Sequence, residues 1–266
     1  MPRRPKLGQH FLASEGVARR IVELVPPGAA VVEIGPGRGA LTTGLVERAG
    51  SYLGVELDDQ LADRLAERLG ERDGFRLVKG DFLAFTPPAE LGEELTLVGN
   101  VPYAVSARIV QRAVAEPRYR RAVLMFQREF ARRLTAGAGE SDYGSLSVYV
   151  DYHWRTRIAL HVPAGRFRPP PRVDSAVIVA ERREVPPIEV DDPEALFTLV
   201  RACFARRRKQ LANADRRGLG VDRETWLTAL EAADIPRNAR AQELALADFA
   251  RLLSILKQPT VDNHEA

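Results

Sequence analysis

Short apolar runs rich in β-branched residues alternate with amphipathic segments over the first 130 residues of the chain. The apolar runs predict strands at residues 29–34, 51–58, 75–81 and 94–100. Between them, helix formers resume at Ala40, and the segments 59–72 and 104–116 carry apolar residues at helical spacing. The run at 120–129 continues from a strand into a helix. Strands that alternate with helices in this way predict an α/β fold with a mostly parallel sheet.

The pattern changes twice in the second half of the chain. Three apolar segments, at 143–154, 155–163 and 175–184, follow one another without an obvious helix between them, and predict strands that close the sheet in antiparallel fashion. The proline-rich stretch "REVPPIEVDDP" then reads as a linker. Beyond it, apolar residues recur every three or four positions and predict a small helical domain. We therefore expect two domains, 1–186 and 187–266.

Composition narrows the class of protein. Of the 266 residues, 45% are hydrophobic and 28% charged, as in ordinary globular domains, and no apolar run reaches the length of about 18 residues that a membrane span needs. The basic N-terminus lacks the apolar stretch of a secretory signal, so we expect a cytoplasmic protein with no membrane partner. The single cysteine, Cys203, excludes an intramolecular disulfide and a cysteine-cluster metal site, and we expect no metal.

Basic residues cluster although the net charge is only +3. The segment "RACFARRRKQLANADRR" carries seven basic residues and one acid, and its run Arg206, Arg207, Arg208 and Lys209 is predicted to lie on a helix. Such a cluster favours a polyanionic partner. A solvated helix face is the structural alternative.

Glycines and acids follow the first three predicted strands. Gly35 and Gly37, in "EIGPGRG", let the backbone approach a ligand where a Cβ would interfere. Glu56 ends the second strand, where a carboxylate can accept both hydroxyls of a ribose. Asp81 follows the third strand and can accept from an adenine amino group. This set predicts a nucleoside-containing cofactor across the carboxyl ends of the strands.

Two cofactors fit the glycine turn. The spacing of Gly35, Gly37 and Ala40 also satisfies the dinucleotide pattern, so an NAD-dependent oxidoreductase is one alternative, and a tight turn without a ligand is another. Glu33 places the turn in the E-x-G-x-G-x-G form seen in methyltransferases. Together with Asp81 and an unusual segment after the fourth strand, it favours S-adenosyl-L-methionine.

That segment, "GNVPY", suits transfer of a methyl group to an adenine amino nitrogen. The nitrogen becomes nucleophilic when acceptors hold its hydrogens, and Asn100 offers a side-chain carbonyl oxygen. Pro102 forces Val101 toward an extended conformation that aims the Val101 carbonyl at the same nitrogen. Tyr103 supplies a flat face for a base taken out of its stack. A turn whose Asn caps a helix and whose Tyr packs in the core is the structural alternative.

Several motifs resemble those of one enzyme family. "LGQHFL", "EIGPGRGALT", "VELD", "GNVPY", "YGSLSV", "FRPPPRVDSAV" and "FARRRKQLANA" are similar to motifs of the KsgA-type ribosomal RNA adenine dimethyltransferases, which are relatives of the Erm antibiotic-resistance methyltransferases. The resemblance covers most of the chain. It implies a Rossmann-like class I S-adenosylmethionine-dependent methyltransferase sheet with a small C-terminal all-helical domain.

The resemblance also implies roles for individual residues. It assigns target-adenine contacts to the GNVPY segment and to Phe167, an aromatic that closes on the base from the other side. The implied cofactor contacts are His10, Leu12, Gly35, Gly37, Glu56, Leu57, Asp81, Phe82 and Asn100. Departures from the family pattern include His10 where many members have Asn, and Ala104 where Asn is common.

The implied reaction dimethylates N6 of two adjacent adenines in a hairpin loop near the 3′ end of 16S rRNA, within a small-subunit precursor. We expect the protein to act as a monomer. An Erm-like enzyme that modifies one adenine of 23S rRNA is the alternative within the family. A non-catalytic RNA-binding assembly factor is an alternative from another class, although the acceptor groups of the GNVPY segment are intact.

Overall fold

The computed structural model describes residues 10–70, 72–206 and 209–257 and divides into two compact units. The first unit runs to Arg132 and resumes as Trp154–Arg182. The second unit comprises Arg133–His153 and the chain from Arg183 onward. Residues 133–153 thus group with the C-terminal helices, whereas the sequence placed them in the N-terminal domain.

A seven-stranded sheet with the order β4-β3-β2-β5-β6-β9-β7 forms the first unit. The first five strands in this order pair in parallel, and β9 pairs antiparallel with both β6 and β7, which confirms the predicted mixed sheet. The strands are β2 (Ala30–Ile34), β3 (Ser51–Glu56), β4 (Leu77–Lys79), β5 (Leu95–Asn100), β6 (Tyr119–Gln127), β7 (Trp154–Val162) and β9 (Ser175–Arg182). Their apolar side chains are buried almost throughout β2, β3, β5 and β9, as expected for strands covered on both faces.

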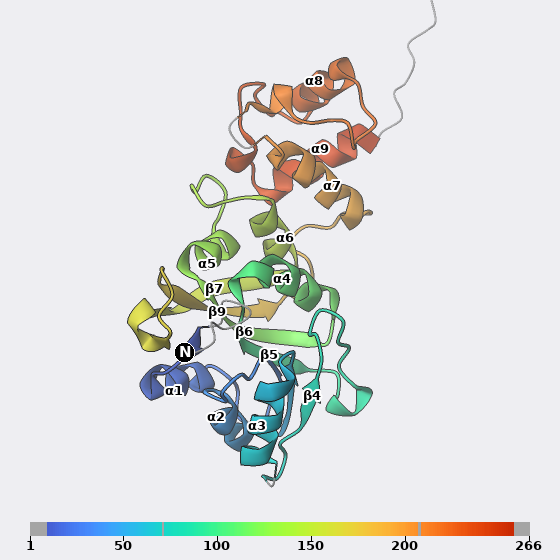
Figure 1. Ribbon diagram of the computed structural model, residues 1–266. Helices are drawn as coiled ribbons and strands as arrows, with labels where there is room; N and C mark the ends of the chain where they lie inside the picture. Colours follow the sequence, from blue (N-terminus) through green and yellow to red (C-terminus); the bar gives the residue numbers. More distant parts are fainter. Residues whose placement is uncertain (1–9, 71, 207–208, 258–266) are drawn as a thin grey trace, which may run out of the picture. The chain divides into compact units, whose positions relative to one another are not determined.

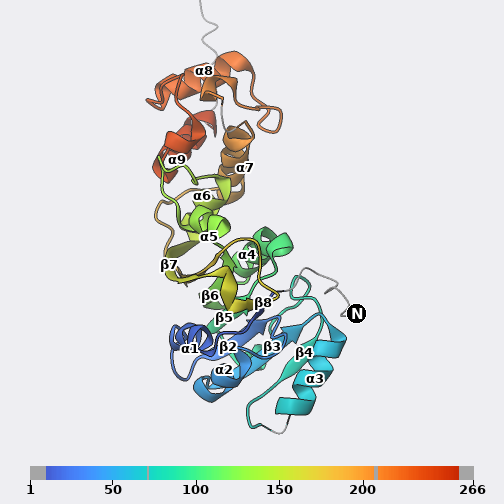
Figure 2. The ribbon, with the colours of Figure 1, turned by 60° about the vertical axis from the view of Figure 1, so that its left-hand side comes forward.

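Helices connect the parallel strands, and α2 and α3 lie beside β2–β4 in both views (Figures 1 and 2). Asp58 begins α3 by accepting hydrogen bonds from the backbone nitrogens of Gln60 and Leu61 at 3.0 and 3.1 Å, which satisfies two otherwise unpaired donors. The helices of this unit are α1 (Glu15–Glu23), α2 (Thr42–Arg48), α3 (Asp59–Leu69) and α4 (Ser106–Ala115), with 3₁₀ turns η1 (Ala89–Leu91), η2 (Tyr103–Val105) and η3 (Ala164–Arg166).

A second, two-stranded sheet joins distant parts of the chain. Strand β1 (Phe11–Leu12) pairs antiparallel with β8 (Phe167–Arg168), so that Leu12 lies opposite Phe167. The backbone nitrogen of Ala13 extends this pairing by donating to the Arg166 carbonyl at 2.8 Å. Residues 10–13, which we call the N-terminal segment, are therefore held by the chain that precedes β9.

The expectation of a strand at 143–154 is wrong, because the structure has helix α6 (Ser145–His153) there. Apolar residues alternate at Leu146, Val148, Val150 and Tyr152, which favoured a strand. The helix is buried on more than one side, with Val148 and Tyr152 in the core of the second unit, so a period of two does not distinguish the two structures here. Helix α5 (Arg128–Thr135) precedes it.

Among the described residues of the second unit, three further helices join α6 around one apolar core, and these three lie together in both views (Figures 1 and 2). They are α7 (Pro193–Phe204), α8 (Arg223–Ala232) and α9 (Leu246–Lys257), with 3₁₀ turns η4 (Leu211–Asn213) and η5 (Ala241–Glu243). Trp226 and Phe249 are completely buried, and Trp226 Nε1 donates to the Leu211 carbonyl at 2.8 Å. Burial also raises the pKa of the Cys203 thiol to about 12, so this cysteine acts as a core hydrophobe. No helix within the described ranges is long and apolar enough to cross a membrane.

Truncating Phe249 to Ala leaves a cavity in the core of the second unit. We expect Phe249→Ala to lower the free energy of unfolding by about 3–5 kcal/mol, measured by urea denaturation. Val185→Ala is the control, because Val185 is 75% exposed and its truncation should change stability by less than about 0.5 kcal/mol. Equal stability of the two variants would contradict the described core.

Candidate functional site

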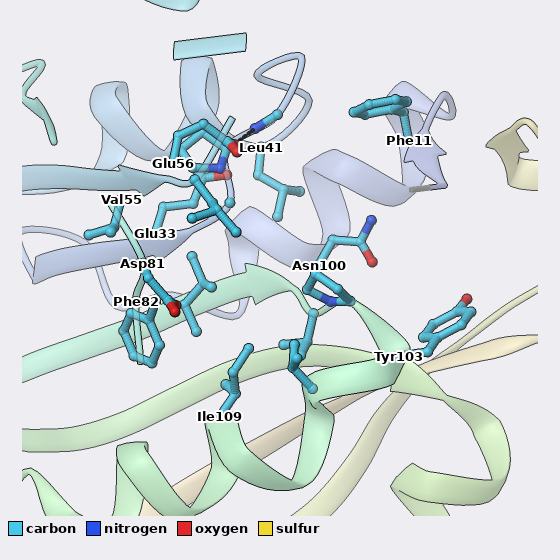
Figure 3. Close-up of a pocket in the computed structure, with 18 of the residues that line it drawn as sticks. Phe11, Glu33, Leu41, Val55, Glu56, Asp81, Phe82, Asn100, Tyr103 and Ile109 are labelled. Carbon is cyan, nitrogen blue, oxygen red and sulfur yellow. Dashed lines mark hydrogen bonds between the residues drawn. The ribbon is translucent and has the colours of Figure 1, made fainter. Parts of the chain in front are cut away.

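The carboxyl ends of β2, β3, β4 and β5 converge on one cavity of about 260 Å³ (Figure 3). Neighbouring parallel strands end at the same edge of a sheet, which is where α/β folds bind ligands. The residues that follow these strands therefore meet, although they are far apart in the sequence. The predicted residues that line the cavity are His10, Leu12, Gly35, Gly37, Glu56, Leu57, Asp81, Phe82, Asn100, Val101, Pro102 and Tyr103.

The glycine turn after β2 leaves room for a ligand. Gly35 and Gly37 have φ values of +57° and +60°, a conformation that residues with a Cβ rarely adopt. A Cβ on Gly37 would lie 3.3 Å from Cε1 of Phe11. The turn is held open because the Gly37 nitrogen donates to Glu56 Oε2 at 2.8 Å.

Two carboxylates face the cavity from β3 and from the loop after β4. Glu56 is buried, and its oxygens accept from the backbone nitrogens of Gly37 and Asp58 at 2.8 and 3.0 Å. Asp81 Oδ1 accepts from the Leu83 nitrogen at 2.9 Å. A carboxylate oxygen has more than one acceptor position, so both groups can still accept from ligand hydroxyl or amino groups.

Apolar side chains flank these carboxylates. Leu57 lines the cavity and is 56% exposed, although it is a large hydrophobic residue. Phe82 also lines the cavity and is buried against Phe85 and Tyr119, with ring centroids 6.5 and 6.3 Å apart. Both side chains offer apolar surface beside the carboxylates.

The amide of Asn100 is oriented by the chain itself. Its Nδ2 donates to the backbone carbonyl of His10 at 2.9 Å, and because that carbonyl can only accept, the nitrogen must face His10. The side-chain oxygen then remains available as an acceptor. In Figure 3 the amide projects from the end of β5 into the space between Phe11 and Tyr103.

Backbone contacts hold the rest of the GNVPY segment. The Val101 nitrogen donates to the Met125 carbonyl at 3.0 Å, and no residue of the described ranges donates to the Val101 carbonyl. The Tyr103 hydroxyl is 3.0 Å from Ser175 Oγ, and burial raises its pKa. Asn100 and Val101 are anchored through their nitrogens, so Asn100 Oδ1 and the Val101 carbonyl remain available as acceptors. The Tyr103 ring lies beside the His10 ring, with centroids 5.9 Å apart.

The N-terminal segment covers part of this cavity. His10 Nδ1 lies 2.8 Å from the Pro169 carbonyl and must donate to it, since that oxygen can only accept. Phe11, which the sequence analysis did not single out, lines the cavity with the Arg38 guanidinium 4.4 Å from its ring centroid. Its position between His10 and Leu12 in "GQHFL" was the available signal.

Phe167 is not brought to the cavity. The side chain is completely buried in the core of the first unit and is not among the residues that line the cavity. The physical reason is that Phe167 lies opposite Leu12 in the β1–β8 pair and both side chains pack in the apolar core of the first unit.

Arg206 and Lys209 of the basic run do not lie on a helix, contrary to the sequence prediction for these two residues. Helix α7 ends at Phe204, and Arg206 and Lys209 lie exposed in the turn that follows, where the Lys209 nitrogen donates to the Arg206 carbonyl at 2.8 Å. Arg207 and Arg208 lie outside the described residues.

Glu33 is a buried acid beside the glycine turn. Its Oε2 accepts from Thr42 Oγ1 at 2.8 Å and from the Tyr52 hydroxyl at 2.6 Å, which ties β2 to α2 and β3. Burial raises the pKa of Glu33 from its ordinary value of 4.5 to about 7, with a smaller contribution from the charge of Glu56, while the two hydrogen bonds oppose the rise. Burial therefore favours the protonated form of Glu33, while Tyr52 and Thr42 supply hydrogen bonds to its carboxyl group.

This raised pKa makes stability depend on pH. The unfolded chain loses the Glu33 proton near pH 4.5 and the folded chain near pH 7, so stability falls as pH rises through this range, by up to about 3 kcal/mol. We expect Glu33→Gln to remove that fall in urea unfolding of the ligand-free protein, whereas Glu184→Gln, at an exposed position, retains it. Parallel pH profiles for wild type and Glu33→Gln would contradict the assignment.

A methyl group at Gly37 should disturb ligand binding. We expect Gly37→Ala to weaken binding of S-adenosylmethionine by about tenfold in calorimetric titration, because a left-handed residue with a Cβ costs roughly 1–2 kcal/mol and the added atom approaches Phe11. Gly16→Ala is the control, since Gly16 lies in α1 and a Cβ there would meet no atom within 4 Å. Equal affinities of the two variants would refute the role of the turn.

Two solved structures resemble this chain over most of its length. The crystal structure of the 23S rRNA methyltransferase ErmE has a TM-score of 0.72 and 29% identity, covering 93% of this chain and 100% of that one. A dimethyladenosine transferase from Plasmodium falciparum has a TM-score of 0.78 and 25% identity, covering 91% and 96%. The first unit therefore has the class I methyltransferase fold that the sequence predicted.

Comparison of the sequence with known proteins identifies the family. A protein of Dehalococcoides mccartyi (strain CBDB1) named ribosomal RNA small subunit methyltransferase A is 37% identical over 254 residues, covering 94% of this chain and 87% of that protein. One of the same name from Synechococcus sp. (strain JA-3-3Ab) is 39% identical over 270 residues, covering 97% and 94%. A family model described as ribosomal RNA adenine dimethylase, whose members use S-adenosyl-L-methionine as methyl donor, matches residues 2–258. This chain belongs to the ribosomal RNA adenine dimethylase family.

Proposed function

We propose that the protein transfers methyl groups from S-adenosyl-L-methionine to N6 of two adjacent adenines in a 3′-terminal hairpin loop of 16S rRNA. The product is N6,N6-dimethyladenosine, formed during maturation of the small subunit. The observation that carries the proposal is the orientation of Asn100, whose nitrogen is bound to the His10 carbonyl while its oxygen remains an acceptor at the end of β5.

The residues that line the cavity of the first unit fit the cofactor. In this proposal the hydroxyls of its ribose bind Glu56, its adenine amino group binds Asp81, and its adenine ring lies between Leu57 and Phe82. The glycine turn lets the backbone approach the remainder of the molecule, beneath Phe11. When bound, S-adenosylmethionine supplies an electrophilic methyl group on a sulfonium.

The GNVPY segment prepares the target nitrogen. The lone pair of an adenine amino group is delocalised into the ring, so the nitrogen is a weak nucleophile. Acceptance of its two N–H hydrogens by Asn100 Oδ1 and the Val101 carbonyl holds the nitrogen and favours its pyramidal form. Stacking on Tyr103, worth about 1–3 kcal/mol, holds the base outside its helix.

Phe167 has a different part in this proposal. Its complete burial leaves Tyr103 as the aromatic face for the target base. Phe167 instead pairs with Leu12 and keeps the N-terminal segment, with the His10 carbonyl that orients Asn100, against the site. It acts through these residues rather than on the base.

Identity favours the small subunit as the source of the substrate. The two small-subunit enzymes described above are 37% and 39% identical to this chain, whereas ErmE is 29% identical. The protein would act as a monomer on a small-subunit precursor, with Arg206, Arg207, Arg208 and Lys209 contacting backbone phosphates. Modification of 23S rRNA is the second candidate, because ErmE matches nearly the whole chain.

Transfer of tritiated methyl groups tests the proposal. Wild-type protein should label small-subunit particles that lack the modification, with the label recovered as N6,N6-dimethyladenosine. We expect Asn100→Ala to lower kcat by about 10²–10³-fold, because an acceptor needed in the transition state is lost. Asn238→Ala, an exposed asparagine, is the control.

The outcomes separate the candidates. Label confined to large-subunit particles would support the 23S alternative. Label in neither particle, from protein that binds S-adenosylmethionine, would overturn the proposed function. Full activity of Asn100→Ala would overturn the role of the amide.

A further inference from the structure

An open cavity of about 680 Å³ lies in the second unit, between η4, the loop after it and the start of α8. Four arginines line this cavity, which we call the arginine cavity: Arg206, Arg216, Arg217 and Arg223. Arg206, Arg216 and Arg217 belong to the basic segment 201–217 that the sequence analysis singled out, whereas Arg223 lies outside it, and Arg206 alone of the four belongs to the run 206–209. The other three come from the loop after η4 and from the first residue of α8.

The charges of the arginine cavity are not balanced. Arg217 is paired with Asp215, the acidic residue of the lining, through bonds of 2.9 and 2.6 Å. Arg206, Arg216 and Arg223 have no carboxylate within ion-pair distance among the residues described. The neighbouring Asp222 feels the charge of Arg216, but its carboxylate caps α8 by accepting from the Thr225 nitrogen at 2.8 Å. Asp215 likewise feels the charge of Arg206 but is held by Arg217, so three guanidinium groups lack a carboxylate in ion-pair contact around one concave surface.

Arg216 lacks acceptors in particular. Its Nε is shielded from solvent and has no hydrogen-bond partner, and its Nη1 makes one long bond of 3.4 Å to the Ala214 carbonyl. Shielded polar groups are normally paired, because an unpaired one loses its hydration without gaining a hydrogen bond. An anion in the cavity would give this guanidinium the acceptors that the chain does not provide.

The composition of the lining indicates which part of a nucleic acid it fits. Arginine forks match the oxygens of a phosphate group, and they keep their charge at any physiological pH. No aromatic side chain is among the residues that line the arginine cavity, so a base would find no stacking surface there. The remaining lining is small or aliphatic, including Ala212, Ala214 and Val221.

We propose that the arginine cavity is a binding site for backbone phosphates of the RNA substrate, with Arg206, Arg216 and Arg223 as its ligands. The site rests on the proposed function for the identity of the RNA, and it supplies affinity and placement rather than sequence recognition. It extends the basic run by residues that lie seven or more positions further along the chain and meet Arg206 only in the folded unit.

Salt titration of RNA binding tests the site. Binding of undermethylated small-subunit particles is measured for wild type, Arg216→Gln and Arg223→Gln at several KCl concentrations. Each variant should lower the magnitude of the slope of log Kd against log [KCl] by about 0.7–0.9 and raise the KM for particles, with kcat and affinity for S-adenosylmethionine unchanged. Arg237→Gln is the matched control, because Arg237 is an exposed arginine of the second unit that lies outside both the cavity and the basic segment 201–217.

Further variants and particles keep the result interpretable. Arg216→Lys keeps the charge and should retain most of the salt-dependence slope. If Arg216→Lys loses the slope and also has a lower melting temperature, the change at position 216 is a folding defect. In that case the slope of Arg223→Gln tests the proposed site. Slopes of Arg216→Gln and Arg223→Gln equal to wild type would overturn the site. The same titration with large-subunit particles separates this result from the proposed function, since a slope change there without methyl transfer to the small subunit would overturn only the choice of substrate.

Discussion

The hydrogen bond between Asn100 and the His10 carbonyl is the interaction on which the candidate active site depends. It joins the last residue of β5 to a segment ninety positions earlier in the chain. The bond determines which end of the amide can accept from a substrate. It requires the N-terminal segment to be in place, and that segment is held in turn by β8 and by the Pro169 carbonyl. The residues that we propose to cover the cofactor and the amide that we propose as acceptor for the target base are thus parts of one connected structure.

The glycine turn shows a related compromise between stability and binding. Gly37 leaves space beneath Phe11, and its nitrogen is used to orient Glu56. Directly behind the turn, Glu33 is buried and holds three elements together through Tyr52 and Thr42. Burying an acid in this way costs free energy at neutral pH, because the charged form loses its hydration. In return, the contacts of Glu33 with Thr42 and Tyr52 support the glycine turn, whose glycines have no side chains that could do so.

The two units present different chemistry to an RNA. The cavity of the first unit has acceptors and an aromatic ring, which suit a single base taken out of its stack. The arginine cavity of the second unit has charge and no aromatic surface, which suits the backbone. Specificity for the modified base and affinity for the surrounding RNA can therefore be supplied by different residues.

Much of the first unit was predictable because its signals are local. Continuous apolar runs identified the parallel strands, and the order of Gly35, Glu56, Asp81 and Asn100 placed a cofactor at their carboxyl ends, since parallel topology brings those ends together whatever the loops between them. The glycine turn alone left NAD open, and the specific combination with GNVPY pointed to methyl transfer. Helices α7 and α9 were also predicted from the sequence, because apolar residues repeated every three to four positions indicate a helix with one buried face.

The sequence by itself thus determined the class of fold and predicted the cofactor edge and the acceptor segment, because each is encoded by neighbouring residues. Only the tertiary structure decided features that depend on distant partners. Residues 145–153 form a helix because more than one of its sides is buried, and Phe167 is enclosed because it pairs with Leu12. Phe11 reaches the glycine turn, and Arg216 and Arg223 meet Arg206, by contacts that no local pattern records. Burial and long-range pairing are properties of the folded chain, so they decided the positions of residues that the sequence left open.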